Sequence, residues 1–369
     1  MKNSEKTSIG PWLLWSTMVM VTLSYGYLNS ITYECKTMGN NGYLAVLLAA
    51  VLTLPGVLIM YLLMKRFPGE NLVQQGIGIM GLFCGRVMGF LYLVFLTLFF
   101  AVFSRDAINI IYTYVLQNTP FTIICTIDFL AAGYLGSRGI ETISRLASFI
   151  VLPFLLVLTL LGVALIPEID LFRLLPVFKL TFNFNGAGGL TILNIFYPIG
   201  LFALITPYLK GIQQKIPRIT FLAFGILVYV SMLLSIGTIG IFGHDYLTRF
   251  AYPSLEVLRT IEQPYLLIEQ AGLFMIILLF SNIIIGSGFM LYIIGLGASQ
   301  VIGGWDYKRY VWLVAVLGFL LKLALPSIAI TKLIVNVIAK YGWIGIWGYP
   351  LLLYLLALIL KKRGGSNVP

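Results

Sequence analysis

Four charged side chains interrupt apolar stretches of this sequence, and they are the first residues that could do chemistry. Arg105 and Asp106 are neighbours in one apolar stretch, Asp128 lies in the middle of the next, and Lys322 lies in a later one. A charge inside a bilayer is costly and is functional or paired by default. We expect Asp128 either to pair with Lys322 or Arg105 or to bind a proton. Because adjacent helical residues do not face each other, Arg105 and Asp106 should have separate partners.

Residues for catalysis or metal binding are few. His244 is the only histidine, and Cys35, Cys84 and Cys125 are far apart in the sequence. A zinc site on one helix face needs two imidazoles, and a phosphate-binding loop needs a glycine-rich stretch followed by lysine; neither pattern occurs. We therefore expect no enzyme activity, no metal and no cofactor. His244, beside Asp245, is expected in an outer loop, where it would form an ion pair or lie in a solvated turn, and the cysteines are expected to be packing residues.

The composition requires a membrane around these residues. Of 369 residues, 60% are hydrophobic and only 10% are charged, which is too apolar for a water-soluble surface. About 20 apolar residues cross a hydrocarbon layer about 30 Å thick. The sequence therefore predicts one all-α polytopic membrane domain over residues 1–369. Its ten spans are expected near 9–33, 42–64, 86–116, 121–136, 144–166, 187–209, 218–242, 265–300, 308–326 and 342–360.

The distribution of lysine and arginine predicts the orientation of the chain. Ten spans put both termini on one side, and the loops of that side hold 15 of the 24 basic residues. The opposite side holds 7, with Lys332 and Lys340 assigned to its loops. The positive-inside rule then places both termini in the cytoplasm. Since the basic residues are spread over six inner segments, the net charge of +11 argues against a nucleic-acid partner.

Two of the expected spans contain residues that interrupt a helix. The first carries Ser24-Tyr25-Gly26-Tyr27 and Asn29, and the sixth carries Tyr197-Pro198 and Gly200. Irregular backbone persists in lipid only where it lines a cavity or is packed in protein. Each break by itself could equally serve packing. However, spans one and six correspond in two five-span halves, about 9–166 and 187–361, as in transporters with inverted repeats. The matched positions favour a small-molecule site.

Several charged motifs accompany this pattern, and they carry a family resemblance over nearly the whole chain. They are Lys65-Arg66-Phe67-Pro68 with Asn71-Leu72, Arg105-Asp106, Gly139-Ile140-Glu141 with Ser144-Arg145-Leu146-Ala147, Phe250-Ala251-Tyr252-Pro253 with Leu258-Arg259-Thr260-Ile261-Glu262, and Lys361-Lys362-Arg363. With them the chain resembles the B subunits of spore nutrient germinant receptors, the spore permease family. The resemblance implies a LeuT-type bundle of the amino acid, polyamine and organocation transporter superfamily. It also implies the inner membrane of bacterial endospores as the location, and an A subunit and a lipoprotein C subunit as partners.

The resemblance further implies a nutrient ligand, expected to be an amino acid, held between spans one, three, six and eight. Half-helix ends there would favour a carboxylate at the amino-terminal end and an ammonium group at freed carbonyls. Two tyrosines flank a single glycine in the first break, where many relatives have a glycine-rich segment, and this suggests a different ligand. Carried onto this chain, the pocket would be drawn from Tyr25, Gly26, Asn29, Phe99, Phe103, Tyr197, Gly200, Ser281, Asn282 and Ile285.

These observations favour a ligand-sensing receptor subunit, with two alternatives left open. A secondary transporter would share the fold and would also need a path for a coupling ion or proton. A structural or assembly subunit would have a pocket that has lost its ligand. Outside the expected pocket, Gly81, Gly85 and Gly89 recur every four residues and predict close helix packing, within this chain or with another subunit.

Overall fold

The computed structural model describes residues 9–25, 27–175, 190–209, 211–247, 250, 252–259 and 266–364. The regular structure in these ranges is helical. The longer helices are α1 (Pro11–Tyr25), α2 (Tyr27–Met38), α3 (Gly42–Arg66), α5 (Leu82–Tyr114), α6 (Phe121–Arg138), α7 (Ile140–Ala164), α9 (Ile216–Phe242), α12 (Leu266–Val301), α13 (Tyr307–Ala324), α14 (Ile328–Trp343) and α15 (Tyr349–Ile359). The shorter ones are η1 (Gly39–Asn41), α4 (Leu72–Met80), η2 (Ile166–Glu168), η3 (Leu171–Leu174), η6 (Gln213–Lys215), α10 (His244–Leu247) and α11 (Pro253–Arg259).

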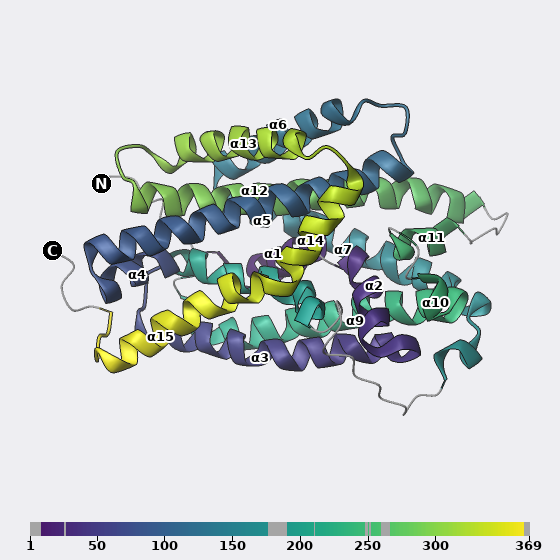
Figure 1. Ribbon diagram of the computed structural model, residues 1–369, viewed down its shortest axis with the longest axis horizontal. Helices are drawn as coiled ribbons and strands as arrows, with labels where there is room; N and C mark the ends of the chain where they lie inside the picture. Colours follow the sequence, from purple (N-terminus) through teal and green to yellow (C-terminus); the bar gives the residue numbers. More distant parts are fainter. Residues whose placement is uncertain are drawn as a thin grey trace.

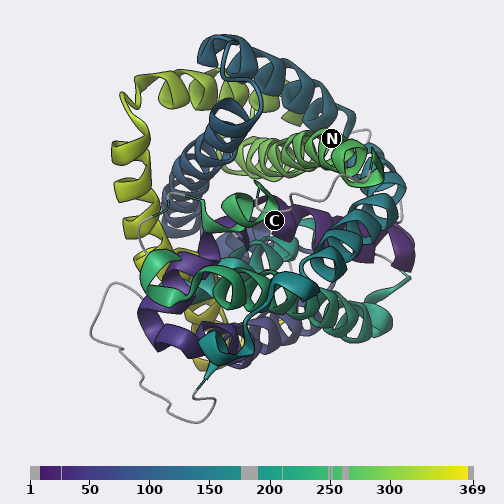
Figure 2. The same cartoon turned by 90° about the vertical axis from the view of Figure 1, so that its right-hand side faces the viewer.

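The helices form two groups that run along the long axis of the molecule. Helices α5, α6, α12 and α13 pack on one another in the first group, and α1, α2, α3 and α9 pack together in the second. Helices α7 and α14 contact both groups, and Figure 2 shows α14 in yellow-green along one flank. Helix α4 and the carboxyl end of α15 lie at one end of the bundle, and α10 and α11 lie at the other (Figure 1).

The first and sixth spans are interrupted, as the sequence predicts. The first is divided into α1 and α2, with Gly26 outside the described residues. The sixth consists of η4 (Leu190–Phe196), the single turn α8 (Tyr197–Gly200) and η5 (Leu201–Tyr208). A 3₁₀ helix of seven or eight residues is unusually long, because its hydrogen-bond geometry is poorer than that of an α-helix. The backbone is therefore irregular at the corresponding positions of the two halves.

The tenth span is longer than the sequence predicts and begins earlier. Its expected range was 342–360, whereas α14 begins at Ile328 and continues through a π-helical segment, Ile344–Gly348, into α15. Ser327 begins the helix by accepting a hydrogen bond from the Ile330 amide at 3.3 Å. Lys332 and Lys340 consequently lie on a helix, and their assignment to an outer loop was wrong. The charges of Lys332 and Lys340 lowered the mean hydropathy of this segment, so the start of the span was not recognised there. The charge of Lys332 is neutralised by a carboxylate that is distant in the sequence.

Two of the charged motifs meet at the end of the bundle where α4 lies. Arg66, at the end of α3, donates through Nε to the Lys362 carbonyl at 2.7 Å and through Nη2 to the Ala357 carbonyl at 2.9 Å. Lys362 in turn donates to the Gly78 carbonyl of α4 at 2.9 Å. The basic ending of the chain therefore caps exposed carbonyl groups at helix ends, which is a favourable position for cations.

The glycine stripe packs within this chain. A Cβ atom at Gly85 would lie 2.5 Å from the Ile77 Cα atom of α4, and one at Gly89 would lie 3.1 Å from Val301 of α12. Gly81 has a φ of 85° and separates α4 from α5. The stripe thus permits a sharp turn and close packing of α5 on α4 and α12, so its contacts do not require another subunit.

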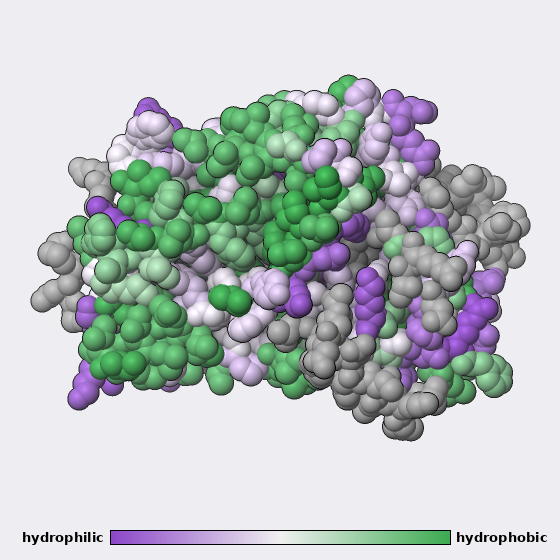
Figure 3. All heavy atoms as spheres, viewed as in Figure 1, coloured by the Kyte–Doolittle hydropathy of each residue, from purple (hydrophilic) through white to green (hydrophobic). Residues whose placement is uncertain are grey.

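The surface is that of a multi-pass membrane protein. Apolar side chains cover most of the face shown in Figure 3, and hydrophilic ones gather mainly toward its two ends. Cys84 is exposed on the surface, contrary to its expected packing role. Six helical stretches of the described residues are long and apolar enough to cross a membrane: Ser30–Arg66, Leu82–Tyr114, Ile140–Glu168, Ile216–Phe242, Ile277–Val301 and Ile328–Ile359. The total of ten spans stays a prediction.

Candidate ligand site and polar cluster

An aromatic cluster lies at the break of the first span. Tyr25 is the last residue of α1, and its ring centroid lies 6.0 Å from that of Phe99 in α5. Phe99 stacks on Phe103 one turn later at 4.4 Å. All three side chains are buried. The structure therefore brings together three of the residues expected in the pocket, from spans one and three.

Helix α12 holds the end of α1 through a single amide side chain. In the orientation that satisfies both groups, the Asn282 amide donates to the Met20 carbonyl at 2.7 Å and accepts from the Ser24 amide at 3.3 Å. These two backbone groups are i and i+4 partners in the last turns of α1, and the Asn282 amide bonds to both of them. Asn282 thus stabilises the interrupted backbone, a role that its position in span eight alone did not reveal.

Two hydroxyl groups beside the break have unused hydrogen-bonding capacity. The Tyr25 hydroxyl lies beside the Ser287 hydroxyl of α12. Neither oxygen has a well-formed hydrogen bond to any described residue, and both are buried. A buried polar group without a partner is costly, and it is often explained by an absent ligand or water. Tyr25 and Ser287 are therefore the polar groups here that a ligand could engage.

The close approach of α12 to the break depends on a residue without a side chain. A Cβ atom at Gly286 would lie 2.9 Å from Tyr25 Cε2 and nearer still to the Ser24 side chain. We expect Gly286→Ala to push α12 from α1 and to lower the melting temperature of the purified protein by several degrees. The matched control is Gly225→Ala on α9, because no atom lies within 4 Å of a Cβ there. Equal melting temperatures for the two variants would contradict the expected packing.

The other expected pocket residues have different surroundings. The Tyr197 hydroxyl donates to the Ala339 carbonyl of α14 at 2.8 Å, and a Cβ at Gly200 would lie 2.5 Å from Ile346 in the π-helical segment. Helix α8, which contains both residues, packs on α1, but no hydrogen bond or ring contact of the described residues joins either of them to Tyr25 or Phe99. Ile285 is fully buried, and Ser281 donates to the Ile277 carbonyl of its own helix at 2.9 Å. Gly26 and the Asn29 side chain lie outside the described residues.

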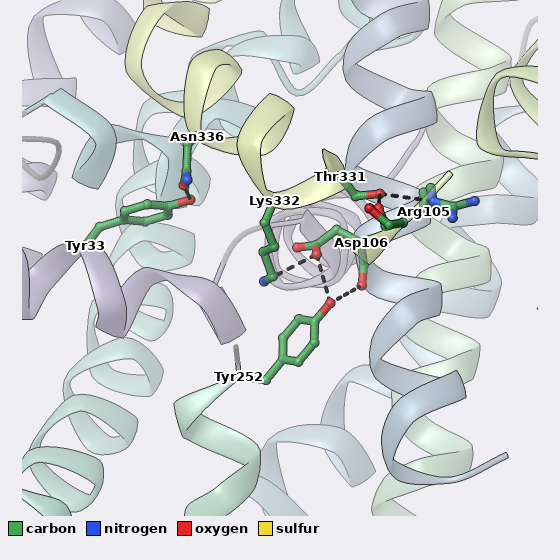
Figure 4. Close-up of polar contacts among 8 residues, drawn as sticks. Tyr33, Arg105, Asp106, Tyr252, Thr331, Lys332 and Asn336 are labelled. Atoms are coloured by element: carbon green, nitrogen blue, oxygen red, sulfur yellow. Dashed lines mark hydrogen bonds and ion pairs between the residues drawn. The ribbon is translucent and has the colours of Figure 1, made fainter. Parts of the chain in front are cut away.

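A polar cluster joins three helices at the end of the bundle where α11 lies (Figure 4). Asp106 of α5 accepts a hydrogen bond from the Tyr252 hydroxyl at 2.9 Å and pairs with the Lys332 ammonium of α14 at 3.3 Å. The same ammonium lies 3.8 Å from the centroid of the Tyr252 ring. Tyr252 directly precedes α11. One carboxylate therefore ties α5, α14 and the segment that leads into α11 to one another.

Three further hydrogen bonds add to this polar cluster. The Arg105 Nε atom donates to Thr331 at 3.1 Å, and its Nη1 atom donates to the Lys322 carbonyl. Tyr33 of α2 donates to the Asn336 side chain of α14 at 2.5 Å. Arg105 and Asp106 thus have separate partners, as their helical positions predict. We use the term polar cluster for Tyr33, Arg105, Asp106, Tyr252, Thr331, Lys332 and Asn336.

Asp128 and Lys322 form a buried salt bridge between α6 and α13. Their charged atoms are 2.6 Å apart, and their side chains are 0% and 1% exposed. The Lys322 ammonium also lies 4.7 Å from the centroid of the Phe100 ring. The expected pairing of Asp128 with Lys322 is confirmed. The pair lies within the first helix group and holds its two helices together.

Sequence reasoning missed two charged groups that matter here. Lys332 was assigned to a loop, although its basic side chain within an otherwise apolar stretch was a signal that a partner carboxylate should be sought. Glu34 was placed just beyond the first span, but it lies inside α2 and is buried. Hydropathy cannot distinguish a charge at a helix end from one that faces another helix.

A comparison with protein families places the chain among germination proteins. A family model described as spore germination protein, the spore permease family, matches residues 9–332. The putative spore germination protein YfkT of Bacillus subtilis is 25% identical over 261 residues, which cover 70% of each chain. Spore germination protein YndE of the same organism is 23% identical over 280 residues, which cover 72% of this chain and 73% of YndE.

Solved structures show the same fold in transporters. A Na⁺-coupled sialic acid symporter superposes with a TM-score of 0.67 at 12% identity, covering 94% of this chain and 79% of its own. MhsT in complex with L-phenylalanine gives 0.65 at 12% identity, with 96% and 89% covered. Mhp1, a nucleobase-cation-symport-1 family transporter, gives 0.64 at 15% identity, with 95% and 82% covered. The chain therefore has the LeuT-type fold, and these neighbours are transporters and not enzymes.

Proposed function

Because the chain belongs to the spore permease family of spore germination proteins, we propose that it is the nutrient-sensing membrane subunit of a germinant receptor. The observation that carries the proposal is the broken first span. Its end is lined by the stacked rings of Phe99 and Phe103 and by the hydroxyl groups of Tyr25 and Ser287, which have no hydrogen-bond partner among the described residues. Binding of the nutrient there would trigger germination.

The chemistry of the break supports an amino acid as the nutrient. Carbonyl groups at the carboxyl end of α1 attract an ammonium group, and amide groups at the amino-terminal end of α2 attract a carboxylate. The rings of Tyr25, Phe99 and Phe103 offer an apolar surface to a side chain. A zwitterion with an apolar side chain therefore matches the site without needing a charged residue there.

The polar cluster is the part of the protein that we expect to form in one conformational state and to open in another. It joins α14 to α2, to α5 and to the segment before α11. A ligand shifts such an equilibrium only by binding one state more tightly than the other. We infer that the nutrient favours the state in which the polar cluster is formed, because the cluster then holds α2 and α5, which border the break, to α14.

The partners and the location follow from the same proposal. The subunit would act with an A subunit and a lipoprotein C subunit in the inner membrane of the spore, with both termini on the spore-core side. Spores that lack this protein, and lack redundant receptors, should fail to respond to its nutrient. A normal response of such spores to every nutrient would contradict the sensing role.

Loss of one hydroxyl group at the break should weaken the response to nutrient. We expect Tyr25→Phe to raise the nutrient concentration for half-maximal germination by about tenfold, because about 1.4 kcal/mol of ligand hydrogen bonding is lost. The matched control is Tyr229→Phe on α9, whose hydroxyl lies 3.4 Å from Thr159 on the exposed surface. Germination dose–response curves and immunoblots of the spore membrane give the measurement. An unchanged curve for Tyr25→Phe would support an assembly subunit without a ligand.

The second candidate function is secondary transport, which is favoured by the three transporters that share the fold. Counterflow in proteoliposomes separates it from sensing. The purified protein is first screened by thermal shift against a panel of amino acids, and the binders are then tested as labelled substrates. Specific binding without flux is expected for a sensor, and specific flux would establish a transporter. Absence of binding would contradict both and would direct attention to the assembled complex.

A further inference from the structure

Glu34 is a buried acidic residue of α2 that lies outside the candidate ligand site. Its exposed fraction is 0%. The other two buried carboxylates of the described spans, Asp106 and Asp128, each pair with a lysine, at 3.3 Å and 2.6 Å. Within the described part of the chain, Glu34 forms no salt bridge. The apolar interior therefore provides no positive charge to offset a negative charge at this position.

The hydrogen atoms around Ser235 indicate the state of this carboxyl group. Ser235 Oγ, on α9, lies within hydrogen-bond distance of both Glu34 Oε2 and the Ser231 carbonyl, the latter at 2.8 Å. One hydroxyl group has one hydrogen, and a carbonyl has none to donate. If Ser235 donates to Ser231, the contact with Glu34 is a hydrogen bond only when Glu34 supplies the hydrogen. Both contacts are satisfied when the carboxyl group is protonated.

The other carboxyl oxygen of Glu34, Oε1, also indicates that the carboxyl group is protonated. Glu34 Oε1 is buried and has no hydrogen-bond partner among the described residues. Ser30, one turn earlier on α2, is the other polar side chain beside the carboxyl group. An unsolvated carboxylate oxygen is far more costly to bury than a neutral carbonyl oxygen. The hydroxyl groups of Ser30 and Ser235 can donate to a carboxylate here, but no cation pairs with Glu34 among the described residues, so burial favours the neutral acid.

We propose that Glu34 is a proton-binding site that controls the docking of the half-helix α2 on α9. In the folded protein its carboxylic acid donates to Ser235 and joins the two helices. Release of the proton leaves a carboxylate without a cation between them, so α2 separates from α9. The neighbouring residue, Tyr33, fastens the same half-helix to Asn336 of α14 at 2.5 Å. The proton therefore acts on one of the polar contacts that hold α2, the segment that follows the break, to its neighbours.

This proposal goes beyond the sensing role, because it holds whether the protein senses a nutrient or transports one. Other titratable groups lie on α2 and on the elements that pack against it, and they must be considered as sources of the same effect. They include Cys35 and Lys36 of α2, Tyr43 of α3, Tyr229 of α9, His244 of α10 and Glu256 of α11. None of them forms a salt bridge with Glu34. The experiment must therefore isolate the contribution of Glu34 by substitution.

Thermal unfolding of the purified protein as a function of pH tests the proposal without any nutrient. We expect the melting temperature of the wild type to fall by about 5 °C as the pH rises from about 5 to about 8, because the unfolded chain releases the Glu34 proton at these pH values while the folded protein still holds it. Glu34→Gln keeps the shape and is always neutral, so its melting temperature should stay nearly constant over this range. Glu141→Gln, at an exposed acidic residue, should retain the wild-type slope. An unchanged slope in Glu34→Gln would overturn the proposal.

Infrared spectroscopy of the wild type tests whether the Glu34 carboxyl group is protonated, and this measurement does not depend on how the variants fold. A carboxylic acid absorbs at a frequency distinct from a carboxylate and shifts in heavy water. We expect one such band at neutral pH that moves in Ser235→Ala, since that variant loses the acceptor of the Glu34 proton. Absence of a protonated carboxyl band at neutral pH would overturn the proposal, as would a band that is the same in Ser235→Ala.

Discussion

Lys322→Met is expected to lower the free energy of unfolding by about 3–5 kcal/mol, because it leaves the Asp128 carboxylate charged and unpaired between α6 and α13. The two charged atoms are 2.6 Å apart and both side chains are buried. Asp128 Oδ1 already has no hydrogen-bond partner among the described residues, so no other group can compensate for the lost ammonium. The same loss is expected for Asp128→Leu. Melting temperature in detergent and the yield of folded protein give the measurement.

The double variant separates a structural pair from a functional one. Asp128→Leu combined with Lys322→Met removes both charges and keeps the volume, so most of the lost stability should return. Arg145→Met serves as the control, because it removes an exposed charge pair that contributes little to the free energy of unfolding. Arg145 and Glu141 are 2.7 Å apart, but they are 70% and 37% exposed, so an effect below about 1 kcal/mol is expected. Wild-type stability in either single variant would show that the buried pair does not hold the two helices together.

Lys332→Met is expected to weaken the apparent affinity for the nutrient by about tenfold or more. The variant removes the cation that pairs with Asp106 and lies over the Tyr252 ring, so the closed polar cluster loses a partly buried charge pair. If about 2 kcal/mol of this interaction is specific to the closed state, the ratio of the closed state to the open state falls about 30-fold in the variant. A ligand that favours the closed state must then supply that energy. Nutrient titration of the purified protein measures the change.

Lys340→Met provides a matched control on the same helix. Lys340 lies two turns after Lys332, is exposed, and rests 5.4 Å from the Tyr341 ring centroid. Its replacement should leave the nutrient affinity unchanged. Asp106→Lys combined with Lys332→Asp restores a charge pair of opposite polarity and should recover part of the affinity. Equal affinities in Lys332→Met and Lys340→Met would show that the polar cluster does not control the site.

Much of the fold could be predicted from the sequence because the bilayer imposes simple rules. Apolar length predicted a multi-pass helical protein, and a glycine or a proline in matching spans predicted the two interruptions. The cost of a buried charge predicted that Asp128 needs a cation, and Lys322 was one of two candidates. These inferences depend on properties of single segments, which the order of the residues contains directly.

The details of the site could not be predicted in the same way. Asn282 and Gly286 have no feature in the sequence that marks them among the residues of an apolar span. Because α12 packs against α1, Asn282 bonds to the backbone of α1 and Gly286 allows the two helices to approach closely. Tyr197 was expected to face the pocket, but its hydroxyl donates to the Ala339 carbonyl of α14. The direction in which a side chain points depends on helix rotation, and an irregular 3₁₀ segment changes that rotation.

The sequence by itself determined the membrane class, the interrupted first and sixth spans, and the need for partners at the buried charges. Only the tertiary structure decided which partner each charge has: Lys332 for Asp106, and Ser235 in place of a cation for Glu34. The physical reason is that the cost of burying a charge is a property of one residue in an apolar segment. Its compensation depends on contacts between helices about 200 residues apart in the sequence, which packing alone establishes.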